Sequence, residues 1–600
     1  MIPWPVTLPT ILTLHRSSYL RRSCIVLIVV GICVLLSASV HAAVTLKFDI
    51  DNGSQQTEDN LRAFLSVSRY AARDDLDSPT VTRLQSRIPA EGALALQPLG
   101  YYEPKITSTL QQHGKDWQIT IKVLTGVPVQ LAEVNISVSG DGKDDSHITA
   151  LIDSHPLQMG DRLDHGAYEQ FKSALLHAAK NNGYIDANWQ TSDLLVDRQQ
   201  RKAIVTLQLD TGARYYFGDI TITQSTINAK TMQKLLRVRR GDPYSLDAVL
   251  QSQYVLDDSQ YFSSSEIISE TADPVTHTVA ITVRAKTNRR HNYAVSVGYG
   301  TDTRARGKLT WTDRLVNTAG HRARIELTGS AVGYEAAAHY IVPVGDVALE
   351  KIEFILANTK QELDTATSYR NEFTTELTQA FGSWQRVLFT RLSQERSVYQ
   401  DATIGEVKTF LIIPGITYST LPTHILGQDR RRYTASVTLS GSPSSLGSGA
   451  SYLQLVLQGE RIFDISQAWH LRLRSQVGFT STDNFSKVPA SSRFYAGGDN
   501  SVRGFGLNEL SPINDDKTTG GRYLLYGTVE LERDLPRNFR WATFYDIGNA
   551  INKLDAALQY SAGVGLRWHI SIASFGLDVA QPLSMSGRSP RLHLHISTLF

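Results

Sequence analysis

The last ten residues of the chain, Arg591 to Phe600, have the sequence RLHLHISTLF. Side chains of two kinds alternate along this run. One set consists of Leu592, Leu594, Ile596, Thr598 and Phe600, and the other of Arg591, His593, His595 and Ser597. Because successive side chains of a β-strand point to opposite faces, a period of two residues predicts a strand with one apolar and one polar face.

The same period recurs upstream, as far as His291. Clear examples lie at 292–300, 322–327, 471–479 and 560–569. Strands of ~10 residues that turn apolar side chains to lipid and polar ones to a lumen build transmembrane barrels. The region from 289 to 600 has room for about sixteen such strands. We therefore predict a transmembrane antiparallel β-barrel over residues 289–600.

A soluble β-sandwich is the alternative, because an antiparallel sheet with one wet face has the same period. Three features favour the membrane barrel. Arginine and glutamate occupy the polar face of several strands, aromatic residues lie near strand ends, and the chain finishes on a strand. The final run also looks like the C-terminal signal of outer-membrane barrels, for which the expected residues are Leu592, Leu594, Ile596 and Phe600.

Residues 43 to 288 contain three similar units, each with the predicted order strand, helix, helix, strand, strand. Gly100-Tyr101 in the first unit matches Gly183-Tyr184 in the second, and Gln260-Tyr261 takes the same place in the third. We expect α+β domains with the bounds 43–126, 127–211 and 212–288.

The second and third units share a phrase at the start of a helix, GDRLD at 160–164 and GDPYS at 241–245. Asp164 and Ser245 are residue types that cap helices by accepting a backbone N–H. Apolar residues at helical spacing follow each cap. In the third unit they are Leu246, Val249, Leu250, Tyr254 and Leu256.

The N-terminus has the layout of a secretory signal peptide. Arginines at 16, 21 and 22 precede an apolar run from Cys24 to Leu36, and Val40-His41-Ala42 fits a cleavage site. The apolar run is short against the ~20 residues that a membrane-spanning helix needs. We predict that residues 1–42 are removed and that the mature chain is exported.

Both cysteines, Cys24 and Cys33, lie in this segment, so the mature chain has no thiol for a disulfide, a nucleophile or a zinc site. Loss of the three arginines leaves 57 basic and 58 acidic residues, a balance that does not favour nucleic acid as a partner. Phrases typical of serine hydrolases, zinc proteases and phosphate-binding loops are absent. We expect no enzyme, hence no catalytic residue, and neither a cofactor nor a metal site.

A glycine-rich phrase, FYAGGDNSVRGF at 494–505, interrupts the strands. Its glycines permit tight turns, and Arg503 is a planar cation with several N–H donors. A second phrase, FYDIG at 544–548, lies in a strand whose period places Asp546 and Gly548 on the luminal face. A guanidinium and a carboxylate that both reach the lumen are expected to pair. We therefore predict an ion pair between Arg503 and Asp546.

The two phrases resemble the most specific elements of the BamA/TamA superfamily of outer-membrane assembly proteins, the VRGF phrase of the sixth extracellular loop and the F-x-D-x-G strand motif. The matching residues are Val502, Arg503, Gly504, Phe505, Asp546 and Gly548. The three upstream units resemble POTRA domains, which are periplasmic modules of the same superfamily. The resemblance implies a bacterial outer-membrane protein with periplasmic repeats and a loop folded into its lumen. It departs at 570–574, where relatives often have a proline-containing turn.

Three repeats are typical of the TamA branch. The resemblance implies the outer-membrane component of a translocation and assembly module, which inserts or secretes β-barrel or autotransporter-type proteins. It also implies three partners, namely an inner-membrane-anchored TamB-like protein that spans the periplasm, client outer-membrane proteins, and membrane lipid. A two-partner secretion pore and a passive porin are the alternatives.

Two places offer backbone groups to such partners. A β-α-α-β-β sheet has an open edge, and we expect Phe217–Thr223 to be one. The first barrel strand, near 292–300, must join the last, near 591–600, because an open edge is costly in lipid. Gly298 and Gly300 have no side chains for cross-strand packing, so we expect a weak seam there. In relatives such a seam admits client strands.

Overall fold

The structure is a computed structural model, and it describes residues 44–51, 54–71, 73, 76–113, 116–347, 349–400, 405–421, 433–466, 468–514, 517–570 and 573–598. The predicted signal peptide and Phe600 lie outside the described residues. Within the described part of the chain, no helix is long and apolar enough to cross a membrane. The chain divides into two compact units, and the division falls after Arg214.

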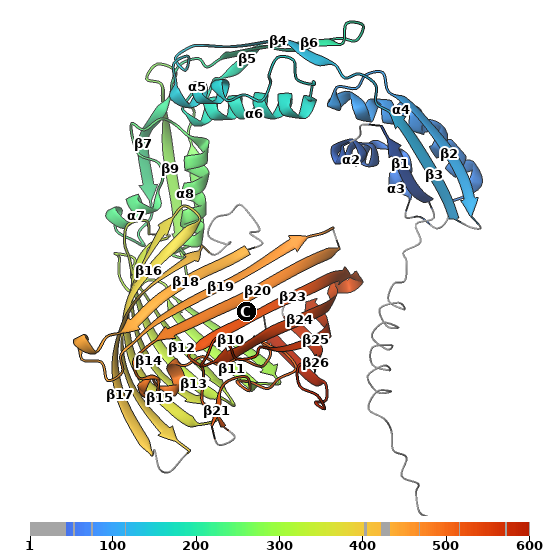
Figure 1. Cartoon of the computed structure of the whole chain (residues 1–600). Coiled ribbons are helices and arrows are strands. Elements are labelled where there is room, and N and C mark those ends of the chain that lie inside the picture. The colour runs from blue at the N-terminus through green and yellow to red at the C-terminus, as the bar shows by residue number, and fades with distance from the viewer. Residues whose placement is uncertain are drawn as a thin grey trace, which may run out of the picture. The chain divides into compact units, whose positions relative to one another are not determined.

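Three small α/β domains come first, each with a three-stranded sheet (Figure 1). The first contains β1 (Val44–Ile50), α2 (Gln55–Phe64), α3 (Ser66–Tyr70), α4 (Ser78–Leu96), β2 (Lys105–His113) and β3 (Asp116–Leu124). The second contains β4 (Gln130–Ser139), α5 (Ser146–Asp153), α6 (His165–Asn181), β5 (Asn188–Asp197) and β6 (Lys202–Asp210). The third contains β7 (Tyr216–Thr223), α7 (Ala229–Leu235), α8 (Leu246–Asp258), β8 (Phe262–Ser269) and β9 (Thr278–Thr287).

The three sheets share one topology. Their strand orders are β1-β3-β2, β4-β6-β5 and β7-β9-β8, so the last strand of each domain lies in the middle. In every case it pairs in parallel with the first strand and antiparallel with the second. β7 is therefore an edge strand, as predicted from Phe217–Thr223.

The predicted helix caps are present, since Asp164 accepts the N–H of Ala167 and Ser245 accepts that of Ala248. The predicted helix is present as α8, but its apolar residues differ in burial. Val249 and Leu256 are buried, but Leu246, Leu250 and Tyr254 are exposed. They differ because the apolar run extends around more than one face of the helix, and only one face packs on the sheet.

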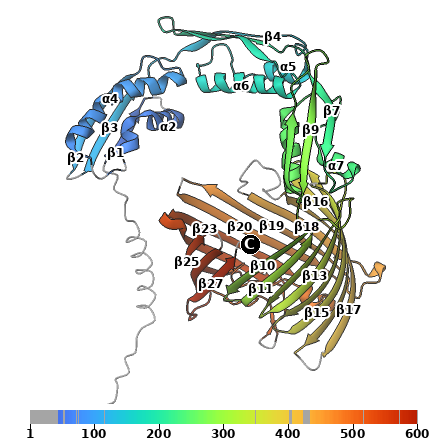
Figure 2. The ribbon, with the colours of Figure 1, turned by 180° about the vertical axis from the view of Figure 1, so that it is seen from behind.

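Sixteen strands close into one antiparallel barrel, as predicted (Figure 2). Their bounds are β10 (His291–Gly300), β11 (Arg304–Asp313), β12 (Arg322–Ser330), β13 (Gly333–Pro343), β14 (Lys351–Glu362), β15 (Ala366–Phe381), β16 (Trp384–Tyr399), β17 (Glu406–Thr420), β18 (Tyr433–Ser442), β19 (Tyr452–Asp464), β20 (Trp469–Ser481), β23 (Tyr523–Leu535), β24 (Phe539–Ile551), β25 (Gln559–Ile570), β26 (Ala573–Pro582) and β27 (Arg591–Thr598). A short hairpin, β21 (Ile513–Asn514) with β22 (Lys517–Thr518), lies apart from the wall.

The strand alternation sorts side chains between the outer wall and the lumen. Along β10, Tyr293, Val295 and Val297 are exposed on the outer wall. Charged residues such as Glu530 and Asp546 take the inner positions and are buried. This is the predicted arrangement of a barrel whose outside faces hydrocarbon.

The third α/β domain holds the barrel at the rim where β10 begins, which we call the near rim. Three backbone oxygens of the β11–β12 turn accept hydrogen bonds from this domain. Asn228 donates its backbone N–H to Thr318 at 2.8 Å, Thr231 donates its hydroxyl to Ala319 at 3.2 Å, and the buried Tyr261 hydroxyl bonds Gly320 at 2.6 Å. The second barrel hairpin is thereby fixed to this domain.

Over the described residues, the seam between β10 and β27 is the shortest ladder in the barrel. Only three register pairs join the described residues of the two strands, Gly298 with Ser597, Tyr299 with Ile596 and Gly300 with His595. The other neighbouring strands share between five pairs, for β17 with β18, and sixteen, for β15 with β16. The described part of this seam is thus short, and its weakness stays a prediction.

Candidate functional site in the barrel lumen

The connection between β20 and β23, residues 482–522, is the longest in the barrel and folds against the inner wall. It carries a small apolar core of its own, packed on β23 and β24. The buried members are Phe494, Ala496, Val502, Phe505, Leu510, Leu524, Tyr526 and Ala550. Two backbone bridges, Phe494 with Gly521 and Ala496 with Leu510, fix the loop's own path.

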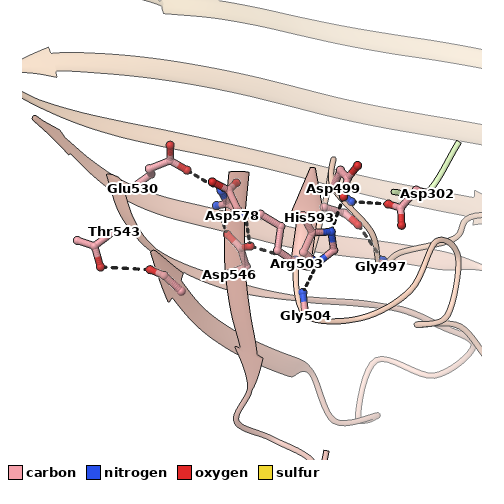
Figure 3. A network of polar contacts seen from close by, with 12 residues as sticks. Asp302, Gly497, Asp499, Arg503, Gly504, Glu530, Thr543, Asp546, Asp578 and His593 are labelled. Atoms are coloured by element: carbon pink, nitrogen blue, oxygen red, sulfur yellow. Dashed lines mark hydrogen bonds and ion pairs between the residues drawn. The ribbon is translucent and has the colours of Figure 1, made fainter. Parts of the chain in front are cut away.

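Arg503 meets Asp546, as its position in the sequence predicts (Figure 3). Its Nε and Nη2 donate to the two carboxylate oxygens at 2.8 and 2.9 Å, and its backbone N–H donates to the same carboxylate at 3.1 Å. Arg503 is 3% exposed and Asp546 is fully buried. This forked geometry satisfies both oxygens, which lowers the cost of burying the pair.

Two further carboxylates converge on the same guanidinium. Nη1 of Arg503 donates to Glu530 at 2.8 Å and to Asp578 at 3.1 Å. Arg567 also contacts both carboxylates, at 2.8 and 3.3 Å. The cluster therefore contains three carboxylates and two guanidinium groups drawn from β23, β24, β25, β26 and the loop.

Aromatic and glycine residues shape the space around this cluster. The guanidinium of Arg503 lies 3.3 Å from the centroid of the Phe544 ring, on which it stacks. A Cβ on Gly563 would overlap that ring, and a Cβ on Gly565 would overlap Asp578. Glycine at both positions therefore leaves space for the Phe544 ring and the Asp578 carboxylate. Gly548 has the same role beside the Tyr526 side chain.

His593 of β27 binds the loop on two sides. The backbone N–H of Gly504, a residue with φ +92°, donates to its Nε2 at 2.9 Å, while its Nδ1 contacts Asp499. Because Nε2 accepts, the proton of the neutral ring is on Nδ1, from which it is donated to the Asp499 carboxylate. The last strand of the barrel thus holds the loop through one histidine.

Asp499 also connects the loop to the other side of the seam. Its backbone N–H donates to Asp302 in the β10–β11 turn at 2.7 Å, and Arg591 of β27 contacts the other oxygen of Asp302 at 3.4 Å. Ligand atoms of Asp302, Asp499 and His593 lie within 4.8 Å of one another, so these three residues are the described group that could accept a metal ion. No metal site was expected from the sequence.

The remaining predicted residues take these positions. Val502 and Phe505 are fully buried in the loop core. In β27, Leu592 is exposed on the outer wall, and Leu594 and Ile596 share its face and are half-buried. Their service as an assembly signal stays a prediction.

Sequence reasoning missed Glu530, Asp578, His593, Asp302 and Asp499 as members of this site. The two-residue period of their strands places Asp578 and His593 on the luminal face, so both could have been predicted as luminal polar residues. Their contact with Arg503 and Gly504 depends on which part of the wall the loop reaches, and strand alternation alone does not specify that.

Comparison with protein family models shows the family to which the chain belongs. The Omp85 superfamily domain matches residues 288–599, which is more than half of the chain. The chain belongs to the Omp85 superfamily. As an Omp85 barrel it is an outer-membrane protein. POTRA domain TamA domain 1 matches residues 47–125, and the POTRA family described as surface antigen variable number repeat matches 215–287. The resemblance to the BamA/TamA superfamily and its TamA branch is confirmed.

Two solved structures are similar to this chain, and the first shares its fold. BamA from Haemophilus ducreyi lacking POTRA domains 1–3 is similar with a TM-score of 0.57 and 14% identity, over 78% of this chain and 99% of that one. CdiB from Acinetobacter baumannii is similar with a TM-score of 0.46 and 15% identity, over 78% of this chain and 89% of that one.

Proposed function

We propose that this Omp85 protein is the outer-membrane component of a translocation and assembly module, which inserts or secretes β-barrel or autotransporter-type proteins at its seam. A TamB-like protein anchored in the inner membrane is its partner on the periplasmic repeats. The protein makes no covalent change to its client. It supplies a strand edge and a folded loop that together lower the cost of opening a barrel.

The seam carries this proposal. Residues His291–Ala294 of β10 have no register partner on the described part of β27, whereas β10 pairs along its whole length with β11. A strand with an open edge in lipid leaves N–H and C=O groups that a second strand can satisfy. Tyr293 and Val295 are exposed beside this edge, and they match the apolar side of an incoming barrel strand.

The luminal loop supports the same mechanism because it touches both sides of the seam. His593 lies on β27 and Asp302 in the turn after β10, and Asp499 of the loop contacts both. Separating the two strands therefore requires these contacts to change. The Arg503 cluster anchors the loop to β23, β24 and β26, away from the seam, so that opening need not release the whole loop.

In the third α/β domain, the backbone groups of edge strand β7 are less covered than those of the opposite edge strand, β8. On β8, the Gln253 side-chain amide accepts the N–H of Ile267 at 3.0 Å and donates to the oxygen of Ser265 at 2.9 Å, as a neighbouring strand would. On β7, residues 241–244 cover only the beginning, where Phe217 exchanges backbone hydrogen bonds with Gly241 and Asp242. We assign residues 218–223 of β7 to a TamB-like partner.

A passive porin fits these observations less well. The loop fills part of the lumen with its own core, and Arg503 is 3% exposed there. A two-partner secretion pore shares the barrel fold. It would carry an extended exoprotein through the lumen, whereas the present proposal brings client strands to the seam.

Photo-crosslinking in cells tests the proposal. A benzoylphenylalanine at Val295, beside the seam, should capture a client barrel protein during assembly. The same probe at Val437, which is exposed on the outer wall of β18, is the matched control. Capture at Val437 alone, or a client found only by probes on the luminal loop, would contradict a role for the seam.

A further inference from the structure

Three amide side chains face outward from the barrel wall, where lipid-facing alternation predicts apolar residues. Asn358 of β14 is the register partner of Asn371 on β15, and Asn371 is the partner of Gln394 on β16. All three are exposed. Their strands follow one another round the wall between β13 and β17 (Figures 1 and 2). They form what we call the amide row.

The amide row crosses a hollow of 530 Å³ in the outer wall. Ala336 and Ala338 of β13 provide little side-chain volume there, while Leu356, Phe373 and Leu392 stand around them. These three apolar residues lie two positions from the amide row, on the side of the near rim. The hollow is thus apolar on its near-rim side and polar along the amide row.

A row of basic and aromatic side chains lies two positions from the amide row, on the side of the far rim. Its members are Lys360, Tyr369, Arg396 and Lys408, which are register partners in succession. Arg396 stacks on the Tyr369 ring with 4.5 Å from its guanidinium carbon to the ring centroid. Glu362 contacts Lys360, and Glu406 contacts Arg396 and Lys408, which leaves one net positive charge. Two residues of a strand span roughly 7 Å, so the charged row lies about that distance along the strands from the amide row.

Hydrogen bonding within the amide row is incomplete. Asn358 donates one N–H to the oxygen of Asn371 at 2.7 Å. Among the described residues this is the one hydrogen bond of the row. The side-chain oxygen of Asn358 therefore needs a donor, and the NH₂ groups of Asn371 and Gln394 need acceptors. A polar group without such a partner is unfavourable in hydrocarbon. An ester-linked acyl chain supplies acceptors only, whereas an amide-linked chain supplies both.

We propose that this hollow binds one phosphorylated glycolipid of the outer leaflet through its amide-linked acyl chains. The far rim is the outer-leaflet side because the third POTRA domain joins the near rim. The glycolipid phosphates lie at Lys360, Arg396 and Lys408, its N-acyl linkages bond the amide row, and an acyl chain fills the space over Ala336 and Ala338. This is a lipid site beyond the assembly function, and it does not require the seam to open.

Retention of lipid by the full-length barrel in detergent tests this proposal. Native mass spectrometry should find one purified lipid A-type glycolipid per wild-type barrel after washing. The triple variant Asn358→Leu, Asn371→Leu and Gln394→Leu should retain about a hundredfold less, because a hydrogen bond to the lipid is lost at each position. The double variant Thr375→Leu and Thr390→Leu changes outward residues of β15 and β16 outside the row, and it should retain the wild-type amount.

A second variant separates binding from folding. Ala338→Phe fills the hollow without removing a polar group, and it should also lower retention, while the heat-modifiable gel shift of a folded barrel stays unchanged. Equal retention by wild type and the folded triple variant would overturn the proposal. So would displacement of the glycolipid by an equal concentration of glycerophospholipid, whose chains are ester-linked.

Discussion

Arg503 gives three N–H groups to the single carboxylate of Asp546, two from its guanidinium and one from its own backbone. The backbone bond means that Asp546 sets the position of the chain as well as that of the side chain. Glu530 and Asp578 add to this contact without replacing it, since both bind only Nη1. The luminal loop is therefore fixed at Arg503, through both a backbone and a side-chain contact with Asp546.

Loss of Arg503 should cost more than loss of Asp546. Arg503→Ala leaves three buried carboxylates that only Arg567 can still neutralise, whereas Asp546→Ala leaves Arg503 with two partners. We expect Arg503→Ala to lower the free energy of unfolding by about 3–5 kcal/mol and Asp546→Ala by less. Unfolding in denaturant measures both. Arg503→Lys is the control, because it keeps the charge but loses the fork.

The double variant completes this test. Two residues in direct contact should show non-additive losses, so the double variant should be little worse than Arg503→Ala alone. Additive losses would mean that the loop and β24 are stabilised separately.

His593 should hold the loop to the last strand. His593→Leu removes the acceptor for the Gly504 N–H and the donor to Asp499. We expect limited proteolysis within residues 482–522 to become about tenfold faster, which corresponds to about 1.4 kcal/mol of lost local stability. His595→Leu is the matched control on the same face of β27. Equal rates for the two variants would show that His593 does not hold the loop.

The junction of the third POTRA domain with the barrel should weaken at alkaline pH. Burial raises the pKa of the Tyr261 hydroxyl above the ordinary value of 10.0, although Arg322 opposes this. Folding thus favours the neutral phenol, whose hydrogen bond to Gly320 is fully present below the ordinary pKa and is lost as pH rises through the raised one. Tyr261→Phe should lose about 1 kcal/mol at neutral pH and show no such alkaline step. A melting curve that falls equally in both proteins would contradict this origin.

Partner binding should depend on β7 beyond Phe217. Proline removes one N–H, so proline at those positions of 219–223 that keep the sheet intact should lower binding of a TamB-like partner about tenfold. Proline at Phe217 is unsuitable, because its N–H already bonds Asp242. Ser265→Pro on β8 is the control, since Gln253 covers that edge. Circular dichroism checks the fold of each variant, and unchanged binding by the folded ones would exclude β7.

The sequence predicted the features that depend on local pattern. Alternation predicted the barrel and its sixteen strands, and the two motifs predicted the contact of Arg503 with Asp546. Features that depend on register were not predicted, because register follows from the tilt and closure of the whole barrel. Glu530 and Asp578 belong to this class. The amide row was missed for another reason, since Asn358 and its neighbours break the alternation on which the prediction relied.

The most direct test of the account is a disulfide across the seam. Tyr299→Cys with Ile596→Cys joins register partners of β10 and β27, whose Cα atoms in such pairs lie within the range a disulfide can span. Val295→Cys with Leu309→Cys, which joins β10 to β11, is the matched control. Oxidation in cells should stop client assembly in the seam variant and leave it unchanged in the control. Client assembly at the full rate with the seam locked would contradict the account.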